Sequence, residues 1–124
     1  MAKNLNEILL AAAALIEHNG YHGGDYYPDA CSVSNATWPF SERPLSSYGA
    51  IRMAAGNGER LACDGDAAEA LLFAAWCLSD WSVIRNAIDA DWALQAWEAE
   101  VRPDGATVVA ALRTMADGAM AAAA

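Results

Sequence analysis

The sequence is poor in basic residues. It contains one lysine and six arginines against 16 acidic residues, which gives a formal net charge of −9. Direct binding of nucleic acid needs a positive surface, because neutralisation of phosphates drives the association, and anionic membrane surfaces repel a chain of this charge. We therefore expect no direct nucleic-acid partner and no membrane partner, whereas a basic protein partner would be attracted to the acidic surface.

Cysteine and histidine are too few and too scattered to predict a metal site. Cys31, Cys63 and Cys77 are odd in number and form no CxxC pair, and neither His18 nor His22 shows ligand spacing with them. Phosphate-binding glycine motifs are also missing. We expect reduced thiols, with Cys77 in the core, and neither a metal nor another cofactor.

Long hydrophobic runs are missing as well. The two longest, residues 8–16 and 70–78, have about nine residues each, whereas a transmembrane helix needs about 20. The first run is flanked by Glu7 and Glu17, which is typical of an amphipathic helix and not of a signal peptide. We therefore expect a cytoplasmic, intracellular protein.

Alanine in helical patterns is what the sequence has in abundance. In residues 5–19 apolar side chains recur three and four positions apart, Asn4 precedes them as a cap with Glu7 three residues later, and Gly20 ends the helix. Further helices are expected at residues 45–55, 67–78, 80–88, 92–101 and 106–118. Helix 67–78 is apolar almost all round, so we expect it to be the most buried, with Trp76 in the core.

Residues 20–44 follow neither a helical nor a strand pattern, yet they are rich in aromatic residues. Loops longer than about 12–15 residues are uncommon in compact domains unless they are functional or disordered, and disordered segments are poor in aromatics. We therefore predict an all-α fold: one domain over residues 1–124, with 1–3 and 119–124 frayed, built as an irregular compact bundle of five or six helices with one long ordered aromatic-rich loop.

This loop also supplies most of the candidate site residues. Tyrosine and tryptophan dominate many binding surfaces because they combine an apolar body with a polar tip. His22 close to Asp25 is the arrangement that orients an imidazole for general-base chemistry, although no nucleophile motif accompanies it. The candidate binding residues are Tyr21, His22, Asp25, Tyr26, Tyr27, Trp38, Trp92 and Trp97, and no residue is predicted to be catalytic.

Three short blocks of the sequence resemble a small, functionally uncharacterised domain family of actinobacteria and their phages. They are the Gly-aromatic step at residues 15–24, the Gly-Ala-Ile segment within 47–54, and the Trp-acidic turn that leads into a Val-rich helix at 97–112. The chain departs from the family pattern because it lacks the usual Cys before Gly49 and the Asn that often follows the late Trp. The resemblance implies a phage or actinobacterial intracellular context and brings no catalytic residues.

Three functions are compatible with these features. The first is a non-enzymatic, phage-related accessory protein that contacts a host protein or a small molecule through its Tyr/Trp-rich loop. The second is a nucleic-acid mimic that inhibits a host DNA-binding or defence protein, with the acids of residues 64–69, 89–91 and 98–100 in place of phosphates. The third is a small hydrolase or transferase that uses His22 and Asp25. The acid clusters near helix starts have a structural explanation too, because negative charge stabilises a helix N-terminus.

Overall fold

The computed structural model describes residues 4–23, 42–57, 61–62, 64–79 and 83–123. Its helices are α1 (Leu5–Asn19), α2 (Ser47–Ala55), α3 (Gly65–Leu78), α4 (Ala87–Val101) and α5 (Gly105–Ala123). The all-α class is confirmed. The aromatic-rich part of the predicted loop lies outside the described residues, and with it the candidate residues Asp25, Tyr26, Tyr27 and Trp38.

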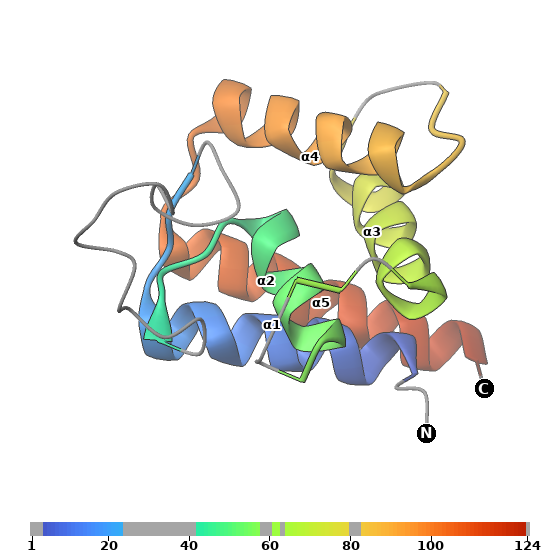
Figure 1. The fold of residues 1–124 in the computed structure, drawn as a ribbon, viewed down its shortest axis with the longest axis horizontal. Helices are drawn as coiled ribbons and strands as arrows, with labels where there is room; N and C mark the ends of the chain where they lie inside the picture. Colours follow the sequence, from blue (N-terminus) through green and yellow to red (C-terminus); the bar gives the residue numbers. More distant parts are fainter. Residues whose placement is uncertain (1–3, 24–41, 58–60, 63, 80–82, 124) are drawn as a thin grey trace.

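The helices are arranged around α2 (Figure 1). The antiparallel helices α1 and α5 lie side by side and form the most extensive helix pair, and α4 lies across the opposite side of the molecule. Helix α2 contacts α1, α3 and α4, and every residue from Ser47 to Ala54 is buried. None of the helices within the described ranges is both long enough and apolar enough to span a membrane.

The expectation that the helix at 67–78 is the most buried is wrong. Helix α3 buries only a narrow face, made of Leu71 and four alanines, while Trp76 is 62% exposed and Cys77 is exposed as well. An apolar sequence does not by itself decide which helix is central. The short helix α2 is enclosed between α1, α3 and α4, whereas α3 is left with an apolar outer face.

Most helix starts follow the local signals of the sequence. The Asn4 side chain accepts a hydrogen bond from the Glu7 amide (3.0 Å) and donates one to the Glu7 carboxylate (2.8 Å), as the capping pattern predicts. Ser46, Asp64 and Asn86 cap α2, α3 and α4 in the same way.

Two of the predicted helix boundaries are wrong. Residues 83–86 are not helical, and α4 begins only at Ala87 because the Asn86 side chain caps it there, so the predicted helices 80–88 and 92–101 are replaced by one. Helix α5 passes through Gly118 and continues to Ala123. A single glycine costs about 1 kcal/mol in a helix but need not end it when alanines follow.

Gly20 sets the path of the chain out of α1. Its amide donates to the Ile16 carbonyl (2.8 Å), and its φ of +102° and ψ of 165° lie in a region that is essentially restricted to glycine. The chain then pairs with the entrance to α2: the Leu45 amide donates to the Gly20 carbonyl (3.1 Å) and the His22 amide to the Leu45 carbonyl (3.0 Å). The backbone on the two sides of the long connection is therefore held together.

Replacing Gly20 by alanine tests this conformation. We expect Gly20→Ala to lower the free energy of unfolding by about 1–3 kcal/mol, because alanine is strained at this φ and ψ. Gly118→Ala is the matched control, since an added Cβ meets no other atom there, and it should stabilise the protein by about 0.5–1 kcal/mol. Urea denaturation of both variants measures the difference. A Gly20→Ala protein as stable as the wild type would show that this turn is not strained.

Candidate functional site

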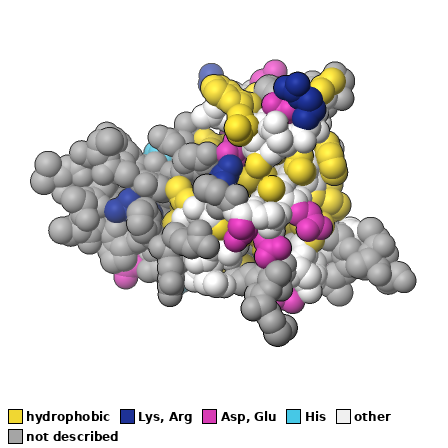
Figure 2. Space-filling model, turned by 45° about the vertical axis from the view of Figure 1, so that its right-hand side comes forward, with side chains coloured by type: hydrophobic (Ala, Val, Ile, Leu, Met, Phe, Trp, Pro, Cys, Tyr) yellow, Lys and Arg dark blue, Asp and Glu magenta, His cyan; other side chains and the backbone are white. Residues whose placement is uncertain are grey.

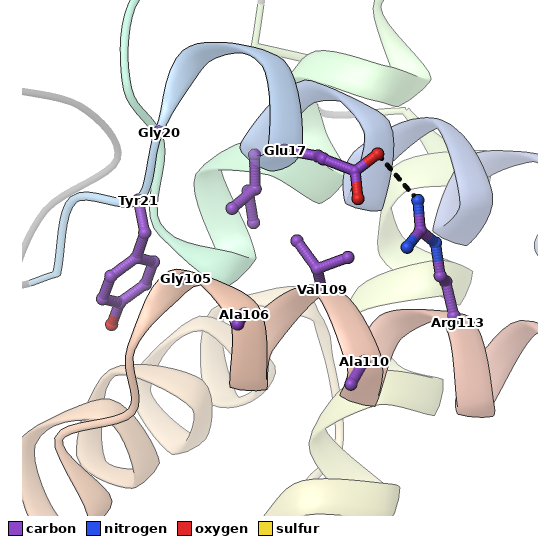
Figure 3. A pocket seen from close by; sticks show the side chains of 9 residues that line it. Glu17, Gly20, Tyr21, Gly105, Ala106, Val109, Ala110 and Arg113 are labelled. Atoms are coloured by element: carbon purple, nitrogen blue, oxygen red, sulfur yellow. Dashed lines mark hydrogen bonds and ion pairs between the residues drawn. The ribbon is translucent and has the colours of Figure 1, made fainter.

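Two clefts meet at Tyr21. The first, which we call the α1/α5 cleft, has a volume of about 660 Å³ and lies between the end of α1 and the first turns of α5 (Figure 3). Glu17 and Arg113 form an ion pair across it at 2.9 Å. It is lined by Ile16, Glu17, Gly20, Tyr21, Gly105, Ala106, Val109, Ala110 and Arg113.

The second cleft lies on the other side of Tyr21, against the C-terminal half of α4. Its volume is about 610 Å³, within the usual range of small-molecule sites, roughly 300–1,000 Å³. We call it the Glu98 cleft. It is lined by Tyr21, Gly23, Gln95, Glu98, Ala99, Arg102 and Pro103.

Glu98 is the most unusual residue of this second cleft because it is a carboxylate that is only 5% exposed. Its position on α4 is four residues after the buried Leu94, so it lies on the inward face of the helix. Oε1 accepts a hydrogen bond from the Tyr21 hydroxyl (2.7 Å), and Oε2 accepts from the Ser47 amide (2.9 Å) and from the Ser47 hydroxyl. Three segments that are far apart in the sequence therefore meet at one side chain.

The start of α2 explains how a carboxylate is accommodated there. Ser47 is the first residue of α2, and the amides of the first helical turn have no partner within their own helix. Glu98 supplies an acceptor from another helix, and the partial positive charge of the helix N-terminus favours the ionised carboxylate. Glu98 thus acts as a cap of α2 that is contributed by α4.

Opposing effects act on the pKa of Glu98. Burial raises it and is the largest effect, while the hydrogen bonds from Ser47 and Tyr21 and the nearby charge of His22 lower it, and the result is a pKa above the usual 4.5. The pKa of the Tyr21 hydroxyl is raised as well, first by burial and then by its bond to Glu98. Tyr21 therefore keeps its proton and serves as a donor.

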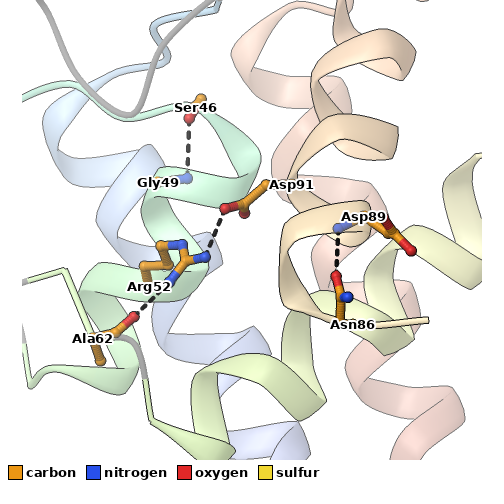
Figure 4. Close-up of polar contacts among 7 residues, drawn as sticks. All are labelled: Ser46, Gly49, Arg52, Ala62, Asn86, Asp89 and Asp91. Atoms are coloured by element: carbon orange, nitrogen blue, oxygen red, sulfur yellow. Dashed lines mark hydrogen bonds and ion pairs between the residues drawn. The ribbon is translucent and has the colours of Figure 1, made fainter. Parts of the chain in front are cut away.

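Two further polar contacts connect α2 to the face of α4 that carries Glu98. Arg52 forms an ion pair with Asp91 at 2.6 Å and also donates to the Ala62 carbonyl (2.9 Å), as Figure 4 shows. Between this pair and Glu98, the Gln95 amide donates to the Tyr48 hydroxyl at 3.5 Å. Residues 91, 95 and 98 are spaced to share one face of α4, so this face is fixed to α2 by polar contacts along its length.

The structure brings together only part of the predicted site. Tyr21 lines both clefts, and His22 is close enough to Glu98 to affect its pKa. Trp92 is 60% exposed, whereas Trp97 is half-buried, contacts the hydrophobic core and lines a smaller cleft of about 240 Å³. These two tryptophans do not line the clefts at Tyr21.

Sequence reasoning missed the importance of Glu98, Ser47 and Arg102. A signal for Glu98 was available: it occurs four residues after Leu94 and eight after Ala90, on the face of the helix that carries the buried residues. A glutamate on an apolar face is rarely buried unless it has a partner. Its partners Ser47 and Tyr21 are 51 and 77 residues away in the sequence, so no local pattern indicates them.

The acid clusters also have different roles from those predicted. Helix α3 is capped by Asp64 and not by Asp66, which the pattern with Glu69 predicts, and α4 is capped by Asn86 and not by Asp89 or Asp91. Asp89 binds Arg85 (3.0 Å), Asp91 binds Arg52, and Glu98 is buried. Three of the acids that a nucleic-acid mimic would display are thus engaged within the molecule.

The chemistry open to the site is limited by burial. Ser47 donates its hydroxyl proton to Glu98 and is itself fully buried, so its oxygen cannot reach a molecule bound in the cleft. Among the described residues no three histidine, cysteine or acidic side chains are placed to hold a metal ion. The cleft offers a carboxylate, an amide, a guanidinium and a tyrosine ring, which together suit ligand binding.

These features define a compact all-α domain with a buried carboxylate on the wall of an open cleft. The chain belongs to the Family of unknown function (DUF6197), whose model matches residues 1–118. The resemblance to a functionally uncharacterised domain family is consistent with this match. No curated protein and no solved structure matches the chain.

The raised pKa of Glu98 leads to a pH dependence of stability. Because the folded protein binds this proton more tightly than the unfolded chain, the contribution of Glu98 to the free energy of unfolding is greatest below pH 4.5 and is lost as the pH rises through the pKa of the folded protein. The stability of the wild type minus that of Glu98→Gln should therefore fall as urea melts are taken from acid toward neutral pH.

Glu100→Gln is the control for this experiment, because Glu100 is an exposed acid two residues further along α4. It corrects for the general effect of removing one negative charge. A wild-type advantage over Glu98→Gln that grows with pH would mean that hydrogen bonding outweighs burial and that the pKa of Glu98 is lowered.

Proposed function

We propose that this domain is a non-enzymatic binding protein that holds a small molecule in the Glu98 cleft. The observation that carries the proposal is the buried Glu98 carboxylate, fixed by three hydrogen bonds, on the wall of a cleft of about 610 Å³. Ligand sites typically combine a preformed cleft with a few precisely placed polar groups. Here Gln95 and Glu98 lie on α4, and polar contacts between α4 and α2 hold them in place.

Binding is favoured over catalysis because the cleft lacks an activated nucleophile among the described residues. Ser47 is buried, and the predicted partner of His22, Asp25, lies outside the described part of the chain. The mimic alternative is not favoured either, because Asp91 and Glu98 are engaged internally. The resemblance found in the sequence supports a phage-related accessory role inside an actinobacterial cell.

A protein partner is a second candidate, supported by a different surface. Trp76, Ile88 and Trp92 are each at least 60% exposed, although large apolar side chains are usually buried. Figure 2, in which the right-hand side of Figure 1 is turned forward, shows hydrophobic side chains next to acidic ones on that side of the molecule. A basic protein with an apolar patch would suit such a surface.

Replacing each of two alanines by phenylalanine tests the small-molecule proposal. Ala99 lines the Glu98 cleft and Ala110 lines the α1/α5 cleft, and both are exposed on helices. We expect small-molecule fragments to shift the amide NMR signals of Gly23, Gln95 and Ala99 in the wild type. Ala99→Phe should abolish these shifts by filling the cleft, while Ala110→Phe should retain them.

The same experiment separates the alternatives. Fragment shifts that persist in Ala99→Phe, or a complete lack of shifts at the Glu98 cleft, would contradict the proposal. Binding that is unaffected by Ala99→Phe but lost in Trp92→Ala would favour the exposed face of α4 and a protein partner.

A further inference from the structure

The charged side chains of the Glu98 cleft form no ion pair with each other. Glu98 and Arg102 are the two charged side chains that line it. The ion pairs among the described residues are Arg52–Asp91, Arg85–Asp89 and Arg113–Glu17, so Glu98 forms no ion pair in that part of the chain, although the charge of His22 lies near it. A carboxylate that is buried without an ion-pair partner is destabilising.

Asp91 shows what the same helix does with a carboxylate that serves only the fold. It lies seven residues before Glu98 and also faces α2, where Arg52 binds it at 2.6 Å. Glu98 is at least as buried, but its hydrogen-bond donors within the described part of the chain are the neutral groups of Tyr21 and Ser47. The difference between the two acids is that Glu98 borders an open cleft, into which a cation from outside can enter.

The hydrogen bonds of Glu98 leave room for such a group. A carboxylate has about four acceptor positions, and Oε2 uses two of them for the amide and hydroxyl of Ser47. Among the described residues, Oε1 accepts only from Tyr21. One acceptor position on Oε1 is therefore left for a donor that enters the cleft.

Arg102 supplies the opposite charge one helical turn further along. It is exposed, forms no ion pair with another described residue, and has a left-handed backbone (φ 51°, ψ 55°) at a position where helices usually carry glycine. Strained residues of this kind often occur at functional sites. Four residues of helix advance about 6 Å, so the backbone positions of Glu98 and Arg102 are about that far apart along α4.

We propose that the ligand of the Glu98 cleft is a zwitterion of dipeptide length, with its ammonium group on Glu98 and its carboxylate on Arg102. This inference rests on the proposed function, because it names the ligand class of the same cleft. Two extended residues span about 7 Å, close to the roughly 6 Å between the backbone positions of Glu98 and Arg102 along α4, whereas the two charges of a single α-amino acid are closer together.

A set of three related peptides tests the proposal on the intact protein. The probes are the dipeptide Ala-Leu, its N-acetyl derivative without the ammonium group, and its C-terminal amide without the carboxylate. NMR titration should show that Ala-Leu binds the cleft, that acetylation weakens binding about tenfold or more because a charge-assisted hydrogen bond to a buried group is lost, and that amidation weakens it less, because Arg102 is exposed. Free leucine should bind more weakly than Ala-Leu.

Three variants test which residue binds the ammonium group of the peptide and which binds its carboxylate. In Glu98→Gln, Ala-Leu and its N-acetyl form should bind equally, and in Arg102→Gln, Ala-Leu and its amide should bind equally. Arg113→Gln, an arginine of the other cleft, is the control and should behave like the wild type. If Glu98→Gln fails to fold, the peptide series on the wild type decides alone.

The failures of the two proposals are distinguishable. If Ala99→Phe abolishes peptide binding but N-acetylation leaves the affinity unchanged, the zwitterion proposal is wrong and the proposed small-molecule function is retained. The same holds if only other fragments occupy the cleft. If neither peptides nor fragments bind there, the proposed function falls as well, and Glu98 is a structural cap of α2 only.

Discussion

The arrangement of this domain depends on the hydrogen bonds of one buried carboxylate. Glu98 comes from α4, accepts two bonds from the first residue of α2, and accepts a third from Tyr21, which follows α1. These bonds tie together α4, the central helix and the beginning of the long connection. The pairing of Tyr21 with Leu45 reinforces this arrangement, because it holds the exit from α1 beside the entrance to α2.

The interaction is a compromise between competing effects. Removing a carboxylate from water is costly, and an apolar residue at this position would often be as stable. The amides at the start of α2 would then lose an acceptor, and buried unpaired amides are costly too. The carboxylate of Glu98 provides an acceptor for the amides at the start of α2 and places a charged side chain on the wall of an accessible cleft. The same residue is therefore suited both to hold the fold and to bind a ligand.

The local features were predictable from the sequence, and the long-range ones were not. Helix α1 was predicted correctly because its cap, its apolar spacing and its final Gly20 all lie within 17 residues. The exposure of Trp76 was not predicted correctly, because the exposure of an apolar residue depends on which other helices its own helix contacts. The prediction of a separate helix at 80–88 was wrong because the Asn86 side chain caps α4 and so starts a helix at residue 87.

For the candidate site, the aromatic step at Tyr21 and His22 was found from composition, but its partner was not. Glu98 was noticed as one of several acids, and its burial follows only once α4 is placed over α2. A residue whose partners are 51 and 77 positions away cannot be identified from spacing. The amphipathic register of α4 was the one indication that this glutamate faces inward.

The most direct measurement is a double-mutant cycle between Tyr21 and Glu98. Tyr21→Phe removes only the hydroxyl, and Glu98→Gln removes the charge with little change of shape. If the two side chains are coupled as described, the free energies of unfolding from urea denaturation should be non-additive by about 1–3 kcal/mol, as expected for a hydrogen bond to a buried charged group. Additivity within about 0.3–0.5 kcal/mol would show that Tyr21 and Glu98 act independently and would contradict the central role given to this contact.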